Sequence, residues 1–328
     1  GKQKLAPSVA VPVCPGTWFE TDARFADLIA VAARNNTIDP GLIEKDYWLM
    51  HCLWGLQQLD YKFELKGGTS LSKGYGLIDR FSEDIDILIH PETDLQYGPN
   101  HNKPAQVKAR LEFFNGLAEA IKIPGIIEVV RDEEFDDTRH YRGAGIRLKY
   151  ESVNPLPEGL KAGILLEVGF DQVAPNRPCT ISSWAYELAV ESGIADLTDT
   201  RAVDVPCYEP GYTFVEKLQT ISTKFRKQQA DGDMPVNFMR HYYDVYCLLA
   251  DASVKEFIGT DAYKDHKAKR FRKADEPDLT RNEAFLLSDA ETRKAYADAY
   301  AKSRALYYRE PALFDDILAR ISRRLPEL

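Results

Sequence analysis

The sequence predicts an α+β fold, in which a mixed β-sheet with flanking helices precedes a helical C-terminal lobe. Short stretches with strand patterning fall between residues 61 and 170, and helical patterns separate them. Beyond about residue 205 the strand patterning fades and the strong patterns are helical. At 328 residues the chain has room for two domains, or for one large domain with an added lobe.

Two helices are predicted before the first strand. Residues 21–36 begin with a threonine that suits an N-cap, and residues 39–59 begin with an Asp-Pro pair. The second helix is mostly apolar, yet Glu44, Lys45 and Asp46 follow one another in its early turns.

Five strands are predicted in the α/β region. They are residues 61–66, 84–90, 125–131, 143–150 and 162–170. The glycine pair 67–68 ends the first strand, and a short helix opens at Thr69-Ser70. An amphipathic helix over 103–123 separates the second and third strands.

The C-terminal part is predicted to be helical. The four expected helices cover residues 211–228, 236–250, 282–308 and 311–325. A boundary is expected in the Pro- and Gly-containing segment 204–211. The predicted domains are an N-terminal helical segment at 1–60, an α/β domain at 61–205 and a helical domain at 206–328.

The composition indicates a globular protein that is neither secreted nor membrane-bound. Apolar residues make up 44% and charged residues 28%, no run of about 18 uncharged apolar residues occurs, and the start lacks a long apolar stretch. The five cysteines are odd in number and never in C-x-x-C spacing, which argues against a disulfide framework and against structural zinc. We expect a cytoplasmic protein.

The charge is unevenly distributed along the chain. The formal net charge is −9, which argues against nonspecific coating of nucleic acid. Three basic segments nevertheless lie in the C-terminal third, at 224–227, 264–273 and 319–325. Such segments can hold a polyanion in one groove, although charged stretches on helices are commonly just solvated faces.

A first candidate site element is the sequence Gly67-Gly68-Thr69-Ser70. Glycines at a strand end allow a tight turn and bring backbone N–H groups close to a ligand. The hydroxyls and the helix start that follow favour a phosphate. Gly-Gly turns are common, so this element alone indicates little.

A second element is the D-x-D pair of the next strand, Asp84 and Asp86. Side chains two apart on a strand share a face, so both carboxylates point one way while Ile85 and Ile87 point into the core. Two close carboxylates repel unless a cation lies between them, and all-oxygen ligation suits Mg²⁺. The alternative is an edge strand with a solvated acidic face.

Four sequence blocks occur in the order known from one family. They are IEKDYWL (43–49), LKGGTSLSKGYGLIDRFSEDIDI (65–87), YTFVEKLQTISTKFRK (212–227) and RHYYDVYCLL (240–249). In these blocks the chain resembles the AbiEii/AbiGii-type nucleotidyltransferase toxins, which are related to the MenT toxins and belong to the DNA polymerase β-type nucleotidyltransferase superfamily. The resemblance implies a nucleotidyltransferase-type sheet domain.

The resemblance implies roles for residues of the first blocks. Gly67, Gly68, Thr69 and Ser70 would bind nucleotide phosphates. Residues 84 and 86 would carry Mg²⁺, as two ions, beside Ser82 of the R-F-S-x-D block.

A third carboxylate is expected from a later, neighbouring strand. Glu167 is the candidate and Asp171 its rival, while an exposed strand position is the alternative reading of Glu167.

The later blocks supply further residues. Lys217 would contact the triphosphate, although a solvated helix lysine is the alternative, and Asp244 would orient basic side chains or act in catalysis. Arg80 is a second candidate for phosphate binding and Lys73 a weaker one. His241 stands where many relatives have an acidic residue, which leaves the detailed role of the last block open.

The activity that the resemblance implies is Mg²⁺-dependent transfer of a nucleoside monophosphate from an NTP to an RNA acceptor. Family members add nucleotides to the 3′ end of tRNA and so block translation, in toxin–antitoxin and phage-defence systems. A cognate AbiEi-like antitoxin is therefore expected as a partner. Two other functions remain open: modification of a protein or small-molecule hydroxyl, and nucleotide binding without turnover.

Overall fold

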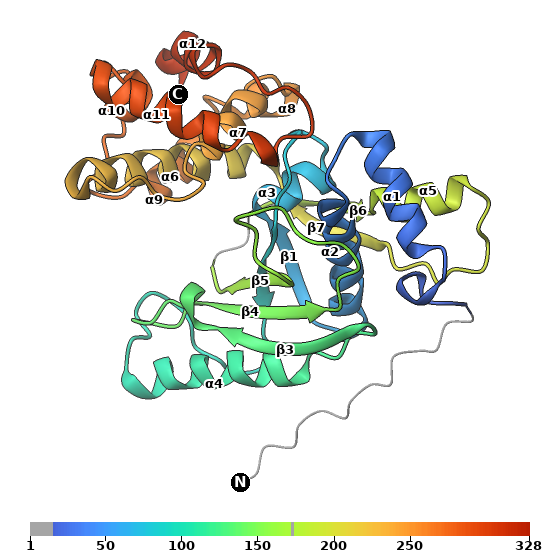
Figure 1. Cartoon of the computed structure of the whole chain (residues 1–328). Helices are drawn as coiled ribbons and strands as arrows, with labels where there is room; N and C mark the ends of the chain where they lie inside the picture. Colours follow the sequence, from blue (N-terminus) through green and yellow to red (C-terminus); the bar gives the residue numbers. More distant parts are fainter. Residues whose placement is uncertain (1–15, 172–173) are drawn as a thin grey trace. The chain divides into compact units, whose positions relative to one another are not determined.

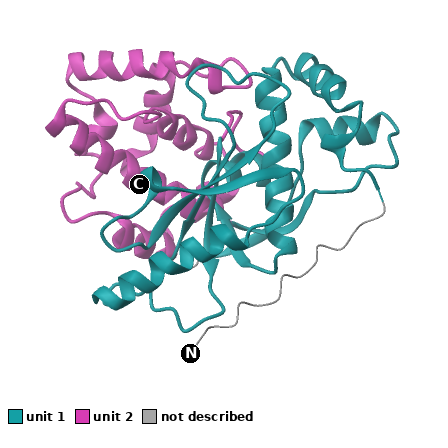
Figure 2. Ribbon diagram, turned by 60° about the horizontal axis from the view of Figure 1, so that its bottom comes forward, with its two compact units in different colours: residues 1–74, 83–207 teal, residues 75–82, 208–328 magenta. Residues whose placement is uncertain are grey.

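The computed structural model describes residues 16–171 and 174–328. The chain forms two compact units, coloured separately in Figure 2. We call residues 1–74 and 83–207 the sheet unit, and residues 75–82 and 208–328 the helical unit. The segment 75–82 belongs to the helical unit, although it lies between two pieces of the sheet unit along the sequence.

The sheet unit is built on one mixed sheet of seven strands (Figure 1). The strands are β1 Lys62–Lys66, β2 Asp84–His90, β3 Ile126–Asp132, β4 Gly143–Tyr150, β5 Ile164–Gly169, β6 Asn176–Ile181 and β7 Ala202–Tyr208. Their order is β3-β4-β5-β2-β1-β7-β6. β2 pairs with β5 and β1 with β7 in parallel, whereas β1–β2, β3–β4 and β4–β5 are antiparallel. The predicted α+β class is confirmed.

The sequence predicted the first five strands, but β6 and β7 were missed. β6 lies at one edge of the sheet, is largely exposed and lacks alternating apolar residues. β7 contains Pro206, and Asp204 in it has a left-handed backbone with φ 54°. A proline in a sequence argues against a central strand, because it lacks the backbone N–H that strand pairing uses. β7 therefore runs through the start of the segment that was predicted as a boundary.

Helices flank the sheet. Those of the sheet unit are α1 Phe25–Asn36, α2 Pro40–Gln58, α3 Gly67–Thr69, α4 Pro104–Ala120 and α5 Trp184–Glu191. α2 begins where predicted, because the Asp39 side chain accepts a hydrogen bond from Gly41 N and Pro40 occupies the first turn. α2 is buried along nearly its whole length and contacts β2 and β5, whereas α4 lies along β3 (Figure 1).

The helical unit contains more helices than predicted. They are α6 Pro210–Asp231, α7 Arg240–Leu248, α8 Ala252–Phe257, α9 Asp261–Arg270, α10 Glu283–Leu286, α11 Ala290–Lys302 and α12 Phe314–Arg324. The single helix predicted over 282–308 is wrong, because Leu287 adopts a left-handed conformation with φ 43° and ends α10. α8 and α9 were missed, and α9 carries few apolar residues.

The segment 75–82 is held by backbone hydrogen bonds within the helical unit. Phe81 N donates to Leu306 O at 2.7 Å, and Tyr308 N donates to Asp79 O at 2.9 Å. Arg80 forms an isolated antiparallel bridge with Tyr307. The chain between the glycine turn and the D-x-D strand is thus anchored among C-terminal residues.

In residues 16–171 and 174–328, no helix has the length and apolar run that crossing a bilayer would take.

The core of the sheet can be tested at β2. Ile85 is fully buried, so Ile85→Ala should lower the free energy of unfolding of the sheet unit by about 3 kcal/mol through lost burial and a cavity. All four tryptophans, residues 18, 48, 54 and 184, lie in the sheet unit, so urea unfolding followed by tryptophan fluorescence reports on it. Ile127→Ala, at a strand isoleucine with 69% exposure, is the matched control and should change the midpoint little. Equal losses in both variants would contradict this assignment of the core.

Candidate active site

Three carboxylates lie on one face of the sheet. Along β2, Asp84 and Asp86 are half-buried while Ile85 and Ile87 are fully buried on the opposite face. Glu167 of β5 is the parallel partner of Asp86 in the register, so its side chain leaves the sheet on the same face. The solvated edge strand is ruled out, because β2 lies inside the sheet between β5 and β1.

Asp171 is placed differently from Glu167. It follows the last residue of β5, Gly169, and its side chain is exposed. Of the two rivals for the third carboxylate, only Glu167 is aligned with the D-x-D pair in the sheet.

The glycine turn packs directly against one of these carboxylates. Gly67 has φ 72°, a conformation that side chains rarely adopt, and a Cβ added to it would lie 3.2 Å from Asp86 Oδ2. The Thr69 hydroxyl donates a hydrogen bond to the Asp84 backbone oxygen at 2.6 Å. The G-G-T-S element and the D-x-D strand are therefore fixed to each other, even though 13 residues separate Ser70 from the start of β2 at Asp84.

Helical backbone continues from this turn. Gly67–Thr69 form α3, and Ser70–Gly74 form a π-helical turn, η2, in which Ser70 is buried. Lys73 of η2, the weak candidate for phosphate binding, forms an ion pair with the buried Asp46 at 2.9 Å.

The carboxylates have the donor chemistry for Mg²⁺. Asp84, Asp86 and Glu167 offer oxygen atoms only, and all three are partly accessible. Within the part of the chain that the structure describes, no three His, Cys, Asp or Glu side chains stand close enough to hold a metal ion. Lys66 Nζ, 3.8 Å from Asp86 Oδ1, supplies positive charge at this position. The residues thus fit a divalent cation in kind, and their side chains would have to turn to bind one.

A second set of predicted residues forms a buried cluster in the helical unit. Asp244 of α7 is fully buried and accepts two hydrogen bonds of 2.6 Å from the Arg80 guanidinium. Lys217 of α6 lies 3.1 Å from Asp244 Oδ2, and its Nζ is 3.3 Å from His241 Nδ1. Lys217 is 9% exposed, so it is no solvated helix lysine.

The electrostatics of this cluster follow from burial and charge pairing. Burial would raise the pKa of Asp244, but Arg80 and Lys217 outweigh burial and hold that pKa below its ordinary value. Burial lowers the pKa of Lys217, against the attraction of Asp244. Burial, followed by repulsion from Lys217, holds the pKa of His241 well below 6.5, so this imidazole is neutral at pH 7. Asp244 therefore orients two cations.

Two further expected residues lie in the segment 75–82. Arg80 is 1% exposed, and its Nη1 donates to Phe81 O while Nε and Nη2 bind Asp244. Ser82 is half-buried and ends the segment 75–82.

The predicted residues fall into two sets. Residues 67–70, 84, 86 and 167 lie in the sheet unit, and residues 80, 82, 217 and 244 lie in the helical unit.

The sequence did not predict that Lys66 lies beside Asp86 or that His241 contacts Lys217. Lys66 directly precedes the glycine pair, and its place opposite Asp86 follows only from the strand register. His241 was noted as a departure from the family pattern, but its contact with Lys217 joins two helices that no local pattern aligns.

A mixed sheet that bears a D-x-D pair beside a glycine turn defines a nucleotidyltransferase-type domain. Comparison with known families agrees: the family described as nucleotidyl transferase AbiEii toxin, type IV toxin–antitoxin system, matches residues 48–320. The chain therefore belongs to the AbiEii nucleotidyl transferase toxin family. No curated protein and no solved structure matches the chain significantly.

The neutral state of His241 makes the stability of the helical unit depend on pH. Below pH 6.5 the unfolded chain gains a proton on this histidine that the folded chain does not, so folding stability falls as the pH drops. The loss should be about 1.4 kcal/mol per pH unit in that range. His241→Gln should make the pH dependence of urea unfolding shallower between pH 7 and 5, measured by circular dichroism.

Proposed function

We propose that this toxin transfers a nucleoside monophosphate from an NTP to a hydroxyl of an RNA acceptor, with the tRNA 3′ end as its target and Mg²⁺ as cofactor. The observation that carries the proposal is the glycine turn packed on Asp86, with Asp84 and Glu167 on the same sheet face. Membership of a nucleotidyl transferase toxin family supports the reaction class.

In the proposed reaction, the acceptor oxygen forms a bond to the α-phosphorus of the NTP. The bond from that phosphorus to the bridging oxygen breaks, pyrophosphate leaves, and the hydroxyl proton is released. Asp84, Asp86 and Glu167 would hold Mg²⁺, which when bound lowers the pKa of the hydroxyl and stabilises the charge on the phosphoryl oxygens.

The glycine turn has a separate role in this proposal. The backbone N–H groups of Gly67 to Ser70 would bind phosphate oxygens, because a glycine backbone permits close approach. Lys217 is assigned to the triphosphate by the family resemblance alone. Arg80 is assigned to orienting Asp244 instead of binding phosphate, because all its guanidinium nitrogens have protein acceptors.

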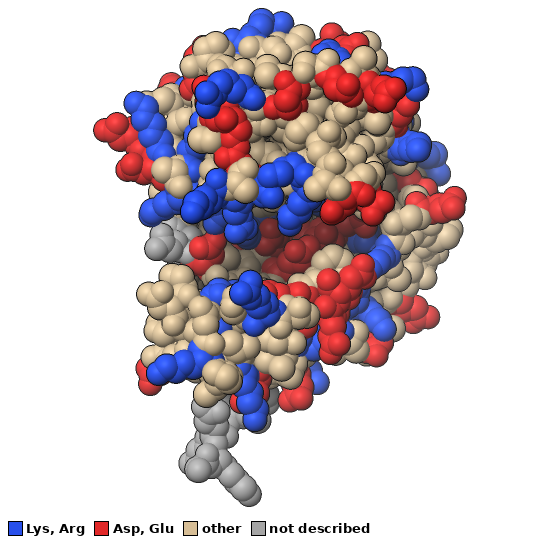
Figure 3. All heavy atoms as spheres, turned by 90° about the vertical axis from the view of Figure 1, so that its left-hand side faces the viewer, with Lys and Arg blue, Asp and Glu red and all other residues tan. Residues whose placement is uncertain are grey.

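An RNA acceptor is supported by a basic groove of the helical unit. A cavity of about 490 Å³ is lined by four cations and two aromatic rings, against two carboxylates: Lys264, Lys267, Arg272 and Lys273, Tyr263 and Phe271, and Asp275 and Glu327. Figure 3 shows Lys and Arg side chains gathered in a band on one face of the molecule. Cations combined with aromatic rings suit a nucleic acid strand, because phosphates and base faces are then both contacted.

Membership of this family indicates a protein partner. A type IV toxin–antitoxin system includes an antitoxin, and we propose that a cognate AbiEi-like protein counteracts this toxin.

The reaction can be tested with purified protein and each labelled NTP in turn. Incubation with total RNA should label the tRNA band, whereas label in a protein extract or in a small molecule would contradict the RNA acceptor. Asp86→Asn should lower the rate more than about 100-fold, since even outer-shell partners of metal ligands typically account for 10–100-fold. Glu92→Gln is the matched control, because Glu92 is an exposed carboxylate just beyond β2 and should retain activity. Full activity of Asp86→Asn would exclude the proposed site.

The basic groove can be tested by charge reversal. The double variant Lys264→Glu and Lys273→Glu should raise KM for RNA with little change in kcat. It should also reduce, by about 2, the slope of the logarithm of the RNA-binding constant against the logarithm of the salt concentration, because each lost phosphate contact accounts for about 1. Lys294→Glu with Lys302→Glu, on α11 outside the groove, makes the same charge change and should leave both quantities as they were. If the two double variants had equal effects, the change in net charge alone would explain them, and the groove would not be the RNA-binding site.

A further inference from the structure

Three consecutive charged residues of α2 are buried, and the proposed reaction uses none of them. Glu44, Lys45 and Asp46 are each at most 1% exposed. Burying a charge is costly unless it is paired and hydrogen-bonded, so each of these side chains must have a specific partner.

Glu44 fixes a loop. Its carboxylate accepts hydrogen bonds from Val153 N at 2.9 Å and from Asn154 N and Nδ2 at 3.0 Å. This residue therefore acts on the connection that leads from β4 to β5.

Asp46 reaches the glycine turn. Its carboxylate lies 2.9 Å from the ammonium of Lys73 in η2, and it accepts a hydrogen bond from Trp184 N at 2.9 Å. The same ammonium lies 4.5 Å from the centre of the Trp184 ring. The end of the Gly67–Gly74 helical segment is thus tied to α2.

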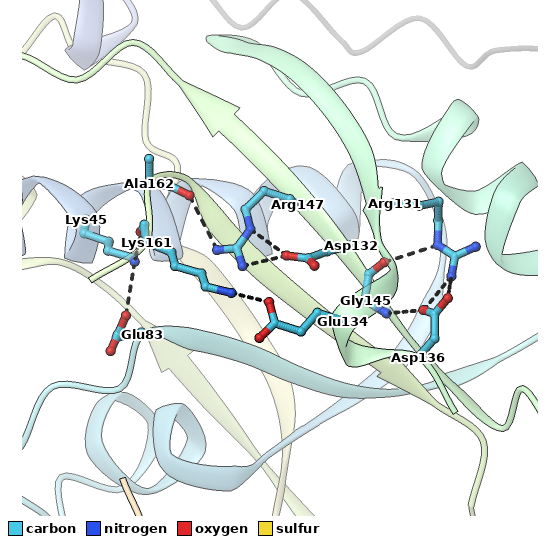
Figure 4. Close-up of polar contacts among 10 residues, drawn as sticks. All are labelled: Lys45, Glu83, Arg131, Asp132, Glu134, Asp136, Gly145, Arg147, Lys161 and Ala162. Carbon is cyan, nitrogen blue, oxygen red and sulfur yellow. Dashed lines mark hydrogen bonds and ion pairs between the residues drawn. The ribbon is translucent and has the colours of Figure 1, made fainter. Parts of the chain in front are cut away.

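Lys45 reaches the D-x-D strand. Its Nζ donates to Lys161 O at 2.8 Å and lies 3.6 Å from Glu83 Oε2. Glu83 directly precedes Asp84, and both carboxylates attract the buried ammonium. Figure 4 shows Lys45 pointing toward Glu83, near the side chain of Lys161.

Further ion pairs secure the neighbouring strands (Figure 4). Arg147 of β4 binds Asp132 at 2.7 Å, and Arg131 of β3 binds Asp136 at 2.6 Å. Lys161, whose carbonyl receives Lys45, pairs through its ammonium with Glu134. Lys45 therefore joins the start of β2 to the residues just before β5, which are themselves held by an ion pair.

We propose that Lys45 and Asp46 are positioning residues. From one helix, they hold the two elements of the nucleotidyl-transfer site in place, the D-x-D strand and the glycine turn. Lys45 fixes the start of β2 and so the Asp84 carboxylate, and Asp46 fixes the end of the glycine turn through Lys73. The inference rests on the proposed function, because it assigns cation binding to Asp84 and phosphate binding to the turn. It predicts different defects for two adjacent residues, whereas a purely structural role predicts loss of stability alone.

The test measures cation binding directly, without turnover. Mn²⁺ is titrated into the full-length protein in the absence of nucleotide, and free Mn²⁺ is followed by electron paramagnetic resonance. Lys45→Met should weaken Mn²⁺ affinity about 10–100-fold, as for residues that orient a metal ligand, because Glu83 at the start of β2 would lose its contact beside Asp84. Lys45→Arg, which keeps the charge, should recover part of the affinity. Asp46→Asn should instead leave Mn²⁺ affinity near that of the wild type and raise KM for the NTP.

Two further variants serve as controls. Lys161→Met removes the ion pair with Glu134 but keeps the carbonyl that receives Lys45, so Mn²⁺ affinity should not change. Glu83→Gln weakens the Lys45 contact at a partly accessible residue. It should lower Mn²⁺ affinity in the same direction even if Lys45→Met does not fold. Thermal unfolding of each variant separates misfolding from a local defect.

The outcomes distinguish the inference from the proposed function. If Asp86→Ala binds Mn²⁺ as well as the wild type does, or if neither binds it, the metal site of the proposed function fails and the inference fails with it. If Asp86→Ala abolishes binding but folded Lys45→Met and Glu83→Gln bind like the wild type, the inference alone is overturned.

Discussion

The candidate site depends on one steric constraint, the close approach of the Gly67 backbone to the Asp86 carboxylate. A Cβ at this position would meet Asp86 Oδ2 at 3.2 Å, and the backbone also has a positive φ. Only glycine satisfies both conditions without strain. Because the turn and the D-x-D strand touch here, a ligand bound by the backbone of the turn must lie beside the carboxylates. Thr69 maintains this arrangement through its hydrogen bond to Asp84 O.

The charged residues of the protein fall into two groups that differ in burial. Asp244, Lys45 and Asp46 are buried, and each has an opposite charge within 3.6 Å. Removing one partner of such a pair typically costs 3–5 kcal/mol, because the other charge stays buried and uncompensated. The carboxylates of Asp84 and Asp86 are instead partly exposed. Buried pairs thus build the framework, while the carboxylates remain accessible to a ligand.

Much of the sheet unit could be predicted from local patterns, because β1 to β5 follow period-two alternation and α2 begins with an Asp-Pro signal. β7 could not, since Pro206 interrupts its strand pattern and Asp204 adopts a left-handed conformation, and its place in the sheet comes from pairing with β1 and β6. The break at Leu287 likewise depends on a backbone conformation that has no glycine or proline to mark it.

The site shows the same division between local and distant information. The D-x-D face follows from residue spacing, and the choice of Glu167 over Asp171 required the β2–β5 register. The pairing of Arg80 with Asp244 joins residues 164 positions apart, so no spacing rule reveals it. Local sequence patterns do not reveal such contacts, so an arginine that is buried in an ion pair can be mistaken in the sequence for one that binds a ligand.

The segment 75–82 has a consequence for synthesis on the ribosome. Its partners lie at Leu306 and Tyr308, more than two hundred residues later in the chain. At about 5–20 residues per second, translation takes on the order of ten seconds or more to reach them. The emerging chain therefore carries its glycine turn and acidic strand for that interval while the connection between them still lacks its anchor. The segment 75–82 therefore gains its anchor only after Leu306 and Tyr308 have left the exit tunnel.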